Sequence, residues 1–567
     1  MDQPDFYFQG IYLGGFQVFD EVTFIPLSRL NLLFGPNSAG KSAVEDALNL
    51  VHQEFFASEV YQYGLGFLNL NSRFSFLNRH WRRLSEEGGS FAPELTLGVR
   101  FASDVHLIGA LENYLKRPTP AKIASAYKET PDFYTIAERY LAKQQPSSWA
   151  DTINPFLTKQ QPSEWSATID LLVKYRIRNV EEIDCVESIN LERDFVFVVN
   201  GQWVAEYKDR KLADIMDSKD SESYFQLNFS HPIFIGYQPA VDFEQISNRY
   251  PDIFQFDEGV VRFSHAYAES LLYENIQSKS FYYGESLALG GLPSELESVV
   301  EELKIYYHSL HSLVMGNRRF EILPNVPASR TIPSKEDLCF LKVDDDDLID
   351  QFCLRDHGDP RYLKLAWNVE VMAKVNQMLT EHLFTERGYF IGSESLNVIP
   401  DNTTIAATLK RLFLVDAQGR KLSFNEVGSG LGYVLPVLCG VCDVVDGSFS
   451  LQGFLFIQQP ELHLHPALQA ALGDVFIECS PGRQVVIETH SEHLLLRILK
   501  RIRQTCSSRP PVPELQIKPE DVSILYFDPS PTGVTHVRRI RIGEDGDFLD
   551  RWPRGFFGER DQELFDE

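Results

Sequence analysis

Cysteine is scarce in this chain, with 7 cysteines among 567 residues. The only close pair, Cys439 and Cys442, lies in an apolar stretch and has no second pair to complete a zinc site. Small buried thiols therefore fit this spacing better than metal ligands do. Scattered cysteines are typical of a reducing compartment, so we expect a cytoplasmic protein.

Long hydrophobic runs are also lacking. The longest, residues 434–445, is too short to span a bilayer and contains Asp443. The first residues have neither the basic nor the apolar segment of a signal peptide. Sustained heptads are missing too, which excludes a coiled-coil arm. We expect no contact with a membrane.

Positive charge is in deficit. Lysine and arginine total 53 against 80 aspartates and glutamates, a net charge of −27, so the average surface repels nucleic acid. Direct nucleic-acid binding would have to use local basic patches, and we interpret these as solvated faces or partner contacts instead. The densest patches are residues 79–83, then Arg497, Lys500, Arg501 and Arg503, and finally Arg538, Arg539 and Arg541.

What the chain does contain is the phosphate-binding pattern G-x-x-x-x-G-K-[ST], between an apolar run and an amphipathic run. A strand, loop and helix in this order are what a P-loop requires, whereas a ligand-free glycine-rich turn would not explain the lysine and serine that follow the last glycine. The lysine would reach the β- and γ-phosphates of ATP, and the serine hydroxyl would bind Mg²⁺. The predicted nucleotide-binding residues are Gly35, Pro36, Asn37, Ser38, Ala39, Gly40, Lys41 and Ser42.

The length of the chain exceeds what one hydrophobic core usually serves. The pattern of elements predicts an α/β protein with an N-terminal part over residues 1–104, a large, mainly helical α+β insertion over 105–395, and a C-terminal part over 396–567. Within the insertion we expect helical structure over 105–180, with a duplicated K-Q-Q-P-S-x-W segment at 143 and 159, a hairpin around Asn200-Gly201, and helices over 292–313 and 362–383. The acidic run at 344–347 is interpreted as a solvated turn.

Three blocks that carry chemistry follow in the C-terminal part. The first contains Ser429 and Gly430 within a glycine-rich stretch. The other two each follow a short apolar strand, and they read Gln458-Gln459-Pro460-Glu461-Leu462-His463-Leu464-His465-Pro466 and Glu488-Thr489-His490-Ser491. His463, His465 and His490 would each, taken alone, be ordinary structural histidines, and His463 with His465 would also admit zinc.

Together with the P-loop, these blocks resemble the ABC-type ATPase heads of the AAA-family OLD, RecF and Rad50 group. The resemblance covers about residues 6–60 and 405–560, and it is strongest to the Septu-type anti-phage ATPases. It implies an ABC-type P-loop ATPase head that forms a homodimer or higher homo-oligomer through its heads. It also implies that Ser429 and Gly430 contact the γ-phosphate held by a second copy, that His490 senses this phosphate, and that His463 and His465 border the interface.

The sequence departs from that group where hydrolysis is decided. Related heads usually hold Mg²⁺ through an acid at the position of Gln458, and many have a glutamate base at the position of Gln459. An amide neither accepts a proton as a general base nor brings negative charge to a cation. Gln458 remains the metal position and Gln459, Glu461 and His490 the catalytic ones, with Glu461 as a compensating acid. We therefore predict ATP binding with slow or absent hydrolysis.

The resemblance further implies a scaffold or switch that controls a separate effector, suspected to be an HNH-type nuclease, in prokaryotic anti-phage defence. Fewer than about eighty residues follow Arg497, too few for a nuclease domain of the OLD type. Two alternatives are an active DNA-repair ATPase of the RecF or Rad50 kind and a transporter nucleotide-binding subunit. The first predicts hydrolysis stimulated by DNA, and the second should be shorter and keep its acids.

Overall fold

The structure is a computed structural model of the whole chain. The residues that it describes are 6–55, 94–103, 167–178, 190–209, 224–234, 241–263, 293–300, 302–303, 306, 321–322, 325–328, 330, 338–343, 361–398, 407–422, 424–426, 429–442, 453–507 and 510–553.

The chain divides into two compact units, each built from several stretches of sequence. The first comprises Met1–Pro26, Asp46–Arg318 and Ser530–Thr535. The second comprises Leu27–Glu45, Arg319–Pro529 and His536–Glu567. The helix α1 (Ala43–Phe55) begins in the second unit and continues in the first. The P-loop and all three C-terminal blocks therefore lie in the second unit.

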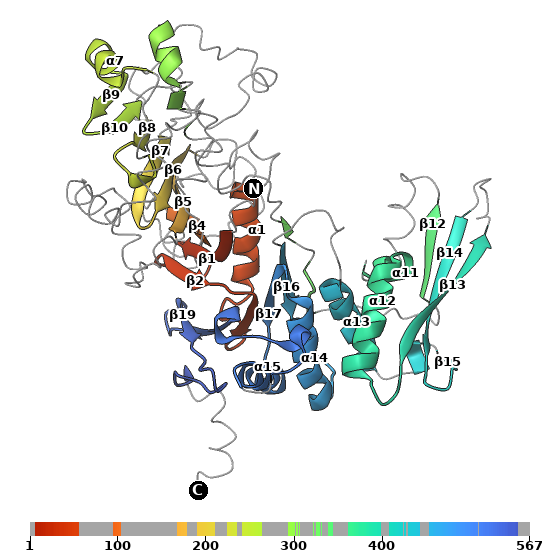
Figure 1. Cartoon of the computed structure of the whole chain (residues 1–567). Coiled ribbons are helices and arrows are strands. Elements are labelled where there is room, and N and C mark those ends of the chain that lie inside the picture. Colours follow the sequence, from red (N-terminus) through yellow and green to blue (C-terminus); the bar gives the residue numbers. More distant parts are fainter. Residues whose placement is uncertain are drawn as a thin grey trace. The chain divides into compact units, whose positions relative to one another are not determined.

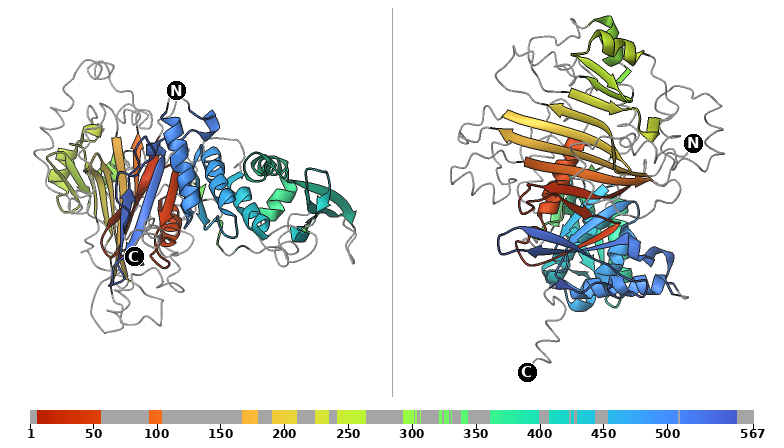
Figure 2. Two further views of the ribbon diagram at one scale, coloured as in Figure 1. Left: turned by 90° about the horizontal axis from the view of Figure 1, so that it is seen from below. Right: turned by 90° about the vertical axis from the view of Figure 1, so that its left-hand side faces the viewer.

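The first unit contains a nine-stranded sheet in which every described strand pair is antiparallel (Figure 2). The strand order is β2-β1-β4-β5-β6-β7-β8-β10-β9. The strands are β1 (Phe6–Gly14), β2 (Thr23–Pro26), β4 (Glu94–Ser103), β5 (Ala167–Arg178), β6 (Asn190–Val199), β7 (Gln202–Asp209), β8 (Tyr224–Asn228), β9 (Phe254–Asp257) and β10 (Val260–Phe263), with the helix α7 (Phe243–Arg249) and the 3-10 turn η6 (Pro232–Phe234) between them.

A buried polar group joins three neighbouring strands of this sheet. Asp170 on β5 is fully buried and accepts hydrogen bonds from the Tyr12 hydroxyl at 2.9 Å and from Arg100 Nε at 2.6 Å. A second guanidinium nitrogen, Arg100 Nη2, reaches its other oxygen at 3.1 Å. Burial raises the pKa of Asp170, and the bonds from Arg100 and Tyr12 oppose that shift. The charges of this group are paired within the sheet.

The main sheet of the second unit has the strand order β11-β16-β17-β3-β18-β19, and its neighbours from β11 to β18 run parallel (Figure 1). The strands are β3 (Leu30–Phe34), β11 (Glu321–Ile322), β16 (Gly453–Gln458), β17 (Arg483–Glu488), β18 (Val522–Pro529) and β19 (Thr535–Ile540). The helices α13 (Ser429–Cys442), α14 (Pro466–Cys479) and α15 (Glu492–Thr505) share one hydrophobic core with this sheet. The predicted α/β fold class is confirmed.

A smaller antiparallel sheet of the second unit combines β12 (Leu338–Val343), β13 (Phe390–Val398), β14 (Ala407–Val415) and β15 (Lys421–Leu422). The helix predicted over 362–383 is confirmed but interrupted: α11 (Arg361–Trp367) ends before Asn368, and α12 (Val369–Met378) follows it. The Asn368 side chain accepts hydrogen bonds from the amides of Glu370 and Val371, each at 3.0 Å, and so begins a new helix.

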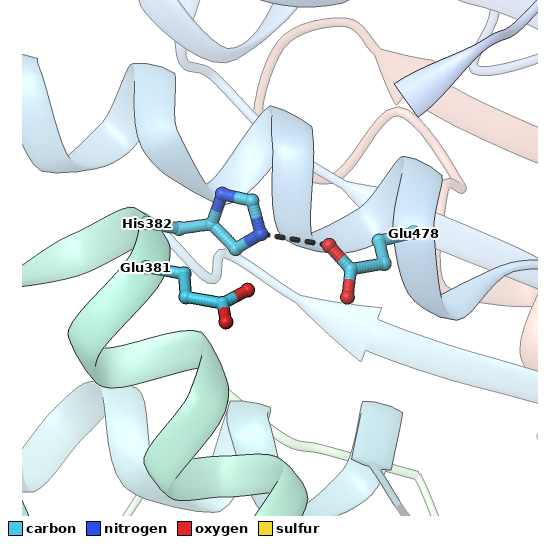
Figure 3. Close-up of side chains that lie close together, drawn as sticks. All are labelled: Glu381, His382 and Glu478. Atoms are coloured by element: carbon cyan, nitrogen blue, oxygen red, sulfur yellow. Dashed lines mark hydrogen bonds and ion pairs between the residues drawn. The ribbon is translucent and has the colours of Figure 1, made fainter. Parts of the chain in front are cut away.

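The second helix ends in a π-helical turn, η8 (Leu379–Leu383), which a polar contact joins to α14. His382 Nε2 lies 2.8 Å from Glu478 Oε2, and Glu381 points to the same place (Figure 3). Gln377 donates to Glu381 at 3.1 Å and to Glu478 at 3.4 Å. Glu381, His382 and Glu478 thus form a polar contact between two packed helical segments.

The other sequence predictions have mixed outcomes. The hairpin is confirmed, since Asn200 and Gly201 have φ of 49° and 80°, as its turn requires. Residues 294–300 are helical, as expected. The expected helix is wrong for β5, Ala167–Arg178, where Ile169, Leu171 and Val173 alternate with a period of two and pair with both neighbouring strands. The remainder of 105–180, with the duplicated segment, and the acidic run at 344–347 lie outside the described residues.

None of the helices in the described part of the chain is long and apolar enough to cross a membrane.

Candidate nucleotide site

The polar residues of the second unit meet at one edge of its parallel sheet. The strands β3, β17 and β16 are neighbours, so their carboxyl ends share that edge. Gln458 and Glu488 are the last residues of β16 and β17, and they are register partners. Glu488 in turn pairs with Leu33, two residues before the P-loop begins. The carboxyl edge of a parallel sheet is where α/β proteins bind ligands.

The P-loop has the backbone that its sequence predicts. Gly35 and Gly40 have φ of 141° and 92°, and Ser38 has φ of 62°. A side chain at Gly35 would also collide, because an added Cβ would lie 2.6 Å from the carbonyl oxygen of Phe527. The preceding strand is fully buried, and α1 begins immediately after the loop. This is the strand, loop and helix geometry that cradles phosphates.

Lys41 and Ser42 both contact the same carboxylate. Lys41 Nζ donates to the carbonyl oxygens of Gly35 and Pro36 at 3.0 and 2.9 Å and lies 3.6 Å from Glu488 Oε1. Ser42 Oγ donates to Glu488 Oε2 at 3.1 Å. Burial lowers the pKa of Lys41, and the negative charge of Glu488 opposes that shift. A hydroxyl and a carboxylate side by side are hard oxygen donors of the kind that Mg²⁺ takes.

Gln458, the predicted metal position, uses both ends of its amide for protein contacts. Its Nε2 donates to Glu45 Oε2 at 3.1 Å, and its Oε1 accepts from the Ala328 amide at 3.2 Å. Glu45 also accepts a hydrogen bond from the side chain of Asn325. The role of Gln458 as a metal ligand stays a prediction. The structure shows another role for its amide, which joins α1 to the segment before Arg330.

The change Gln458→Glu should therefore destabilise the protein. It would place a carboxylate against that of Glu45 and remove a donor, at a cost of about 1–3 kcal/mol at pH 7. Two facing carboxylates raise the folded-state pKa of one of them. The loss of stability should therefore shrink as the pH falls toward the pKa of an ordinary carboxyl group. Urea unfolding from pH 8 to pH 5 measures this. A loss that does not change with pH would contradict the contact.

Gln459, a predicted catalytic position, lies at a strained backbone point with φ of 44°. Its amide donates to the Glu488 carbonyl at 2.7 Å, and its own carbonyl accepts from Arg330 Nη2 at 2.8 Å. Arg330, which is buried, also donates to the carbonyl of Gln458 at 2.9 Å. The two glutamines are thus held through their backbone carbonyls by Arg330, a residue that no sequence pattern singles out.

Glu461 and His490 lie against each other. Glu461 is buried, and its Oε1 accepts from the His490 amide at 2.7 Å. Burial raises the pKa of Glu461, and the bond from the amide makes this carboxyl group a contact that positions the His490 loop. Burial and the positive charge of Lys41 lower the pKa of His490, while Glu488 opposes them. His490 is thus close enough to Lys41 for the lysine charge to act on its imidazole.

The signature block lies at the start of α13. Ser429 is the first residue of that helix, and a Cβ added to Gly430 would lie 2.8 Å from the His463 carbonyl oxygen. The His463 ring packs on Tyr433 with centroids 4.3 Å apart. His465 caps α14, its Nδ1 accepting from the Ala467 amide at 3.3 Å. The block with Ser429 and the H-x-H block are therefore in direct contact.

Two of the three basic patches lie within the described residues, and several of their arginines form internal ion pairs. Arg497 and Arg501 both contact the buried carboxylate of Asp474, at 2.5 and 2.7 Å. Arg538 pairs with Asp528 at 3.1 Å, and Arg541 pairs with Asp550 at 2.7 Å. Residues 79–83 lie outside the described part. These arginines thus contact acidic side chains of the chain itself, and the interpretation of the patches as solvated faces or partner contacts stays a prediction.

Sequence reasoning named the segment that contains Glu488 but assigned no role to this residue. The signal was present, because Glu488 directly follows the apolar strand residues Val485, Val486 and Ile487 and precedes Thr489-His490. What the sequence could not show is that β17 lies between β16 and β3, which brings its last residue beside the P-loop.

Comparison with known proteins gives two family matches. Residues 274–497 match an AAA domain family whose description names the AbiEii toxin and type IV toxin–antitoxin systems. Residues 517–566 match a family of proteins of unknown function (DUF3696). No curated protein matches the chain.

Among solved structures, the SMC head domain from Thermotoga maritima is 9% identical, with a TM-score of 0.32, over 94% of this chain and 99% of that one. The Smc head domain from Pyrococcus furiosus, bound to the C-terminal domain of ScpA, is 10% identical with the same TM-score of 0.32, over 95% and 97%. A third, an SmcHead bound to the C-winged helix domain of ScpA, is 11% identical with a TM-score of 0.29, over 95% and 98%.

The AAA match includes the blocks at Ser429, Gln458 and His490, and it begins after the P-loop, which lies near the start of the chain. The structure brings the two parts together on one sheet edge. The chain thus combines a P-loop at this edge with a segment that matches an AAA domain family.

Proposed function

We propose that this protein binds Mg²⁺ and ATP as a switch, and that its ATP-bound form controls a separate effector in prokaryotic anti-phage defence. The observation that carries the proposal is the meeting of Lys41 and Ser42 with Glu488 at the end of the P-loop strand, two residues before His490. When ATP is bound, the loop amides and Lys41 would hold its phosphates, and Mg²⁺ would supply electrostatic stabilisation of their charge.

Slow hydrolysis follows from what surrounds the phosphates. Both residues that would be acids in related heads are glutamines, and a glutamine cannot take a proton from water. Glu461 is the candidate to replace the missing acid, but one of its carboxylate oxygens accepts a hydrogen bond from the His490 amide. We therefore place Gln459 and Glu461 in positioning roles, and we expect the nucleotide to act by its presence.

ATP-dependent self-association is the second part of the proposal. A triphosphate held by one P-loop leaves its γ-phosphate open on one side, and the start of α13 from a second copy would cover it with Ser429 and Gly430. A ligand that binds only the associated form stabilises that form by mass action. Assembly would then report the nucleotide state.

The change Ser429→Arg tests this association. Sedimentation velocity of the unaltered protein should show a dimer or larger species with ATP and Mg²⁺ and a smaller species without them. Ser429→Arg should remain the smaller species with ATP, because a long cation would replace a small donor at the interface. ATP binding by the single head should persist. Unchanged association of this variant would contradict a signature contact between copies.

The effector is proposed to be a separate nuclease, with an HNH type as the first candidate. The resemblance to Septu-type ATPases supports it, and the matched AAA family's description, which names a toxin–antitoxin system, supports a role in a prokaryotic conflict system. The test is copurification with the product of the neighbouring gene, with and without ATP. If the complex forms equally well with and without ATP, and equally well with Lys41→Ala, the proposed switch is contradicted.

A further inference from the structure

Glu488 lies one strand away from Gln458, the position at which related heads have a metal-binding acid. We infer that Glu488, together with Ser42, holds the Mg²⁺ of bound ATP, and that it therefore replaces the acid missing at Gln458. The inference rests on the proposed function, because it names the metal ligand of that same site.

The first step of the argument is position. Glu488 ends β17, which lies between β16 and the P-loop strand, and it is the register partner of Gln458. Glu488 thus provides a carboxylate at the end of the adjacent strand, nearer the P-loop. Only 12% of the Glu488 side chain is exposed, and its two oxygens contact Ser42 and Lys41 separately.

The second step is the chemistry of the alternatives. Among the described acidic side chains near the P-loop, Glu45 is engaged by Gln458 and Asn325, and Glu461 is engaged by the His490 amide. Ser42, the P-loop residue that would bind the metal, donates to Glu488. Mg²⁺ prefers one or two carboxylates together with phosphate oxygens, so the hydroxyl and this carboxylate fit it.

The third step concerns what changes when ATP binds. The Glu488 carboxylate lies 3.6 Å from the Lys41 ammonium, which is only 2% exposed. The phosphates of ATP would compete with Glu488 for Lys41. Mg²⁺ would then neutralise the carboxylate that the phosphates displace, so the metal and the nucleotide should bind cooperatively.

The experiment measures ATP affinity with Mg²⁺ and with EDTA for the unaltered chain and for Glu488→Gln. In the variant, the enhancement of ATP affinity by Mg²⁺ should fall about 10- to 100-fold. Its affinity for ATP in EDTA should stay equal or become several-fold tighter, because one negative charge near the phosphates is gone. A merely structural role would weaken both affinities together.

Glu45→Gln is the matched control, since it removes one carboxylate of the same kind from a neighbouring position. It should keep the Mg²⁺ enhancement, whereas Ser42→Ala should lose it, and the double variant Ser42→Ala with Glu488→Gln should lose little more than either alone. Glu488→Asp should restore part of it. The affinity of Mn²⁺ for the ATP complex, measured by electron paramagnetic resonance, gives a readout of the metal itself that is independent of hydrolysis.

Two results are distinguishable. If the unaltered chain binds ATP more tightly with Mg²⁺ and Glu488→Gln keeps that enhancement and its Mn²⁺ affinity, the assignment of Glu488 is wrong while the proposed function stands. If the unaltered chain binds no ATP at all, the proposed function fails, and the assignment fails with it. Thermal unfolding without nucleotide confirms that each variant is folded.

Discussion

Replacing Lys41 by alanine should abolish ATP binding. Its ammonium lies within the P-loop, against the carbonyl oxygens of Gly35 and Pro36, where it can reach two phosphates of a bound nucleotide. Two charged hydrogen bonds are worth about 3 kcal/mol or more, so affinity should fall at least about 100-fold. Titration calorimetry with ATP and Mg²⁺ measures the loss.

The control for this change is Lys500→Ala, which removes the same side chain from the exposed face of α15. It should bind ATP as the unaltered protein does. Lys41→Ala should unfold at a lower temperature in the absence of nucleotide, because Glu488 loses its counterion, and a cooperative thermal transition shows that the variant is still folded. Normal ATP affinity in Lys41→Ala would mean that nucleotide binds elsewhere, and the site would be wrong.

Replacing Asp170 by alanine should cause a large loss of stability in the first unit. The change leaves the Arg100 guanidinium, 5% exposed, without the carboxylate that accepts two of its hydrogen bonds. Breaking a buried pair on one side costs about 3–5 kcal/mol, because the remaining buried charge loses the carboxylate that balances it. Urea unfolding gives the total loss, and hydrogen exchange in peptides from β4, β5 and β6 should locate it in this sheet.

Two comparisons separate the buried charge from simple loss of a side chain. Asp257→Ala, at an exposed position on β9, should change the stability by no more than about 0.5 kcal/mol. The double change Arg100→Met with Asp170→Leu should recover most of what Asp170→Ala loses, since apolar side chains then fill the space. If Asp170→Ala costs no more than Asp257→Ala, the buried pair does not stabilise the sheet.

The P-loop could be predicted from sequence because its chemistry is local. Glycines, a lysine and a serine at fixed spacing between a strand and a helix require no distant information. The break at Asn368 and the strand β5 also have local signals, a capping asparagine and apolar residues with a period of two. The pairing of β5 with β4 and β6, which makes it a strand rather than a helix, is provided only by tertiary structure.

The candidate site divides along the same line. Gln458 and Gln459 stand out in the sequence because they replace acids, so sequence reasoning concluded that negative charge was missing. The order of parallel strands, which no local pattern encodes, brings Glu488 to the same edge and restores a carboxylate beside Ser42. Arg330 could not be predicted for a similar reason. It donates hydrogen bonds to backbone carbonyls that lie 128 and 129 residues further along the chain.

The central claim is that two copies of this chain hold ATP between them and respond to its presence. The most direct measurement follows sedimentation and phosphate release in the same sample, with Mg²⁺ and either ATP or a non-hydrolysable analogue. We predict that both nucleotides shift the protein to the larger species and that little phosphate appears while it persists. A shift seen only with ATP and in step with phosphate release, or no shift with either nucleotide, would contradict the claim.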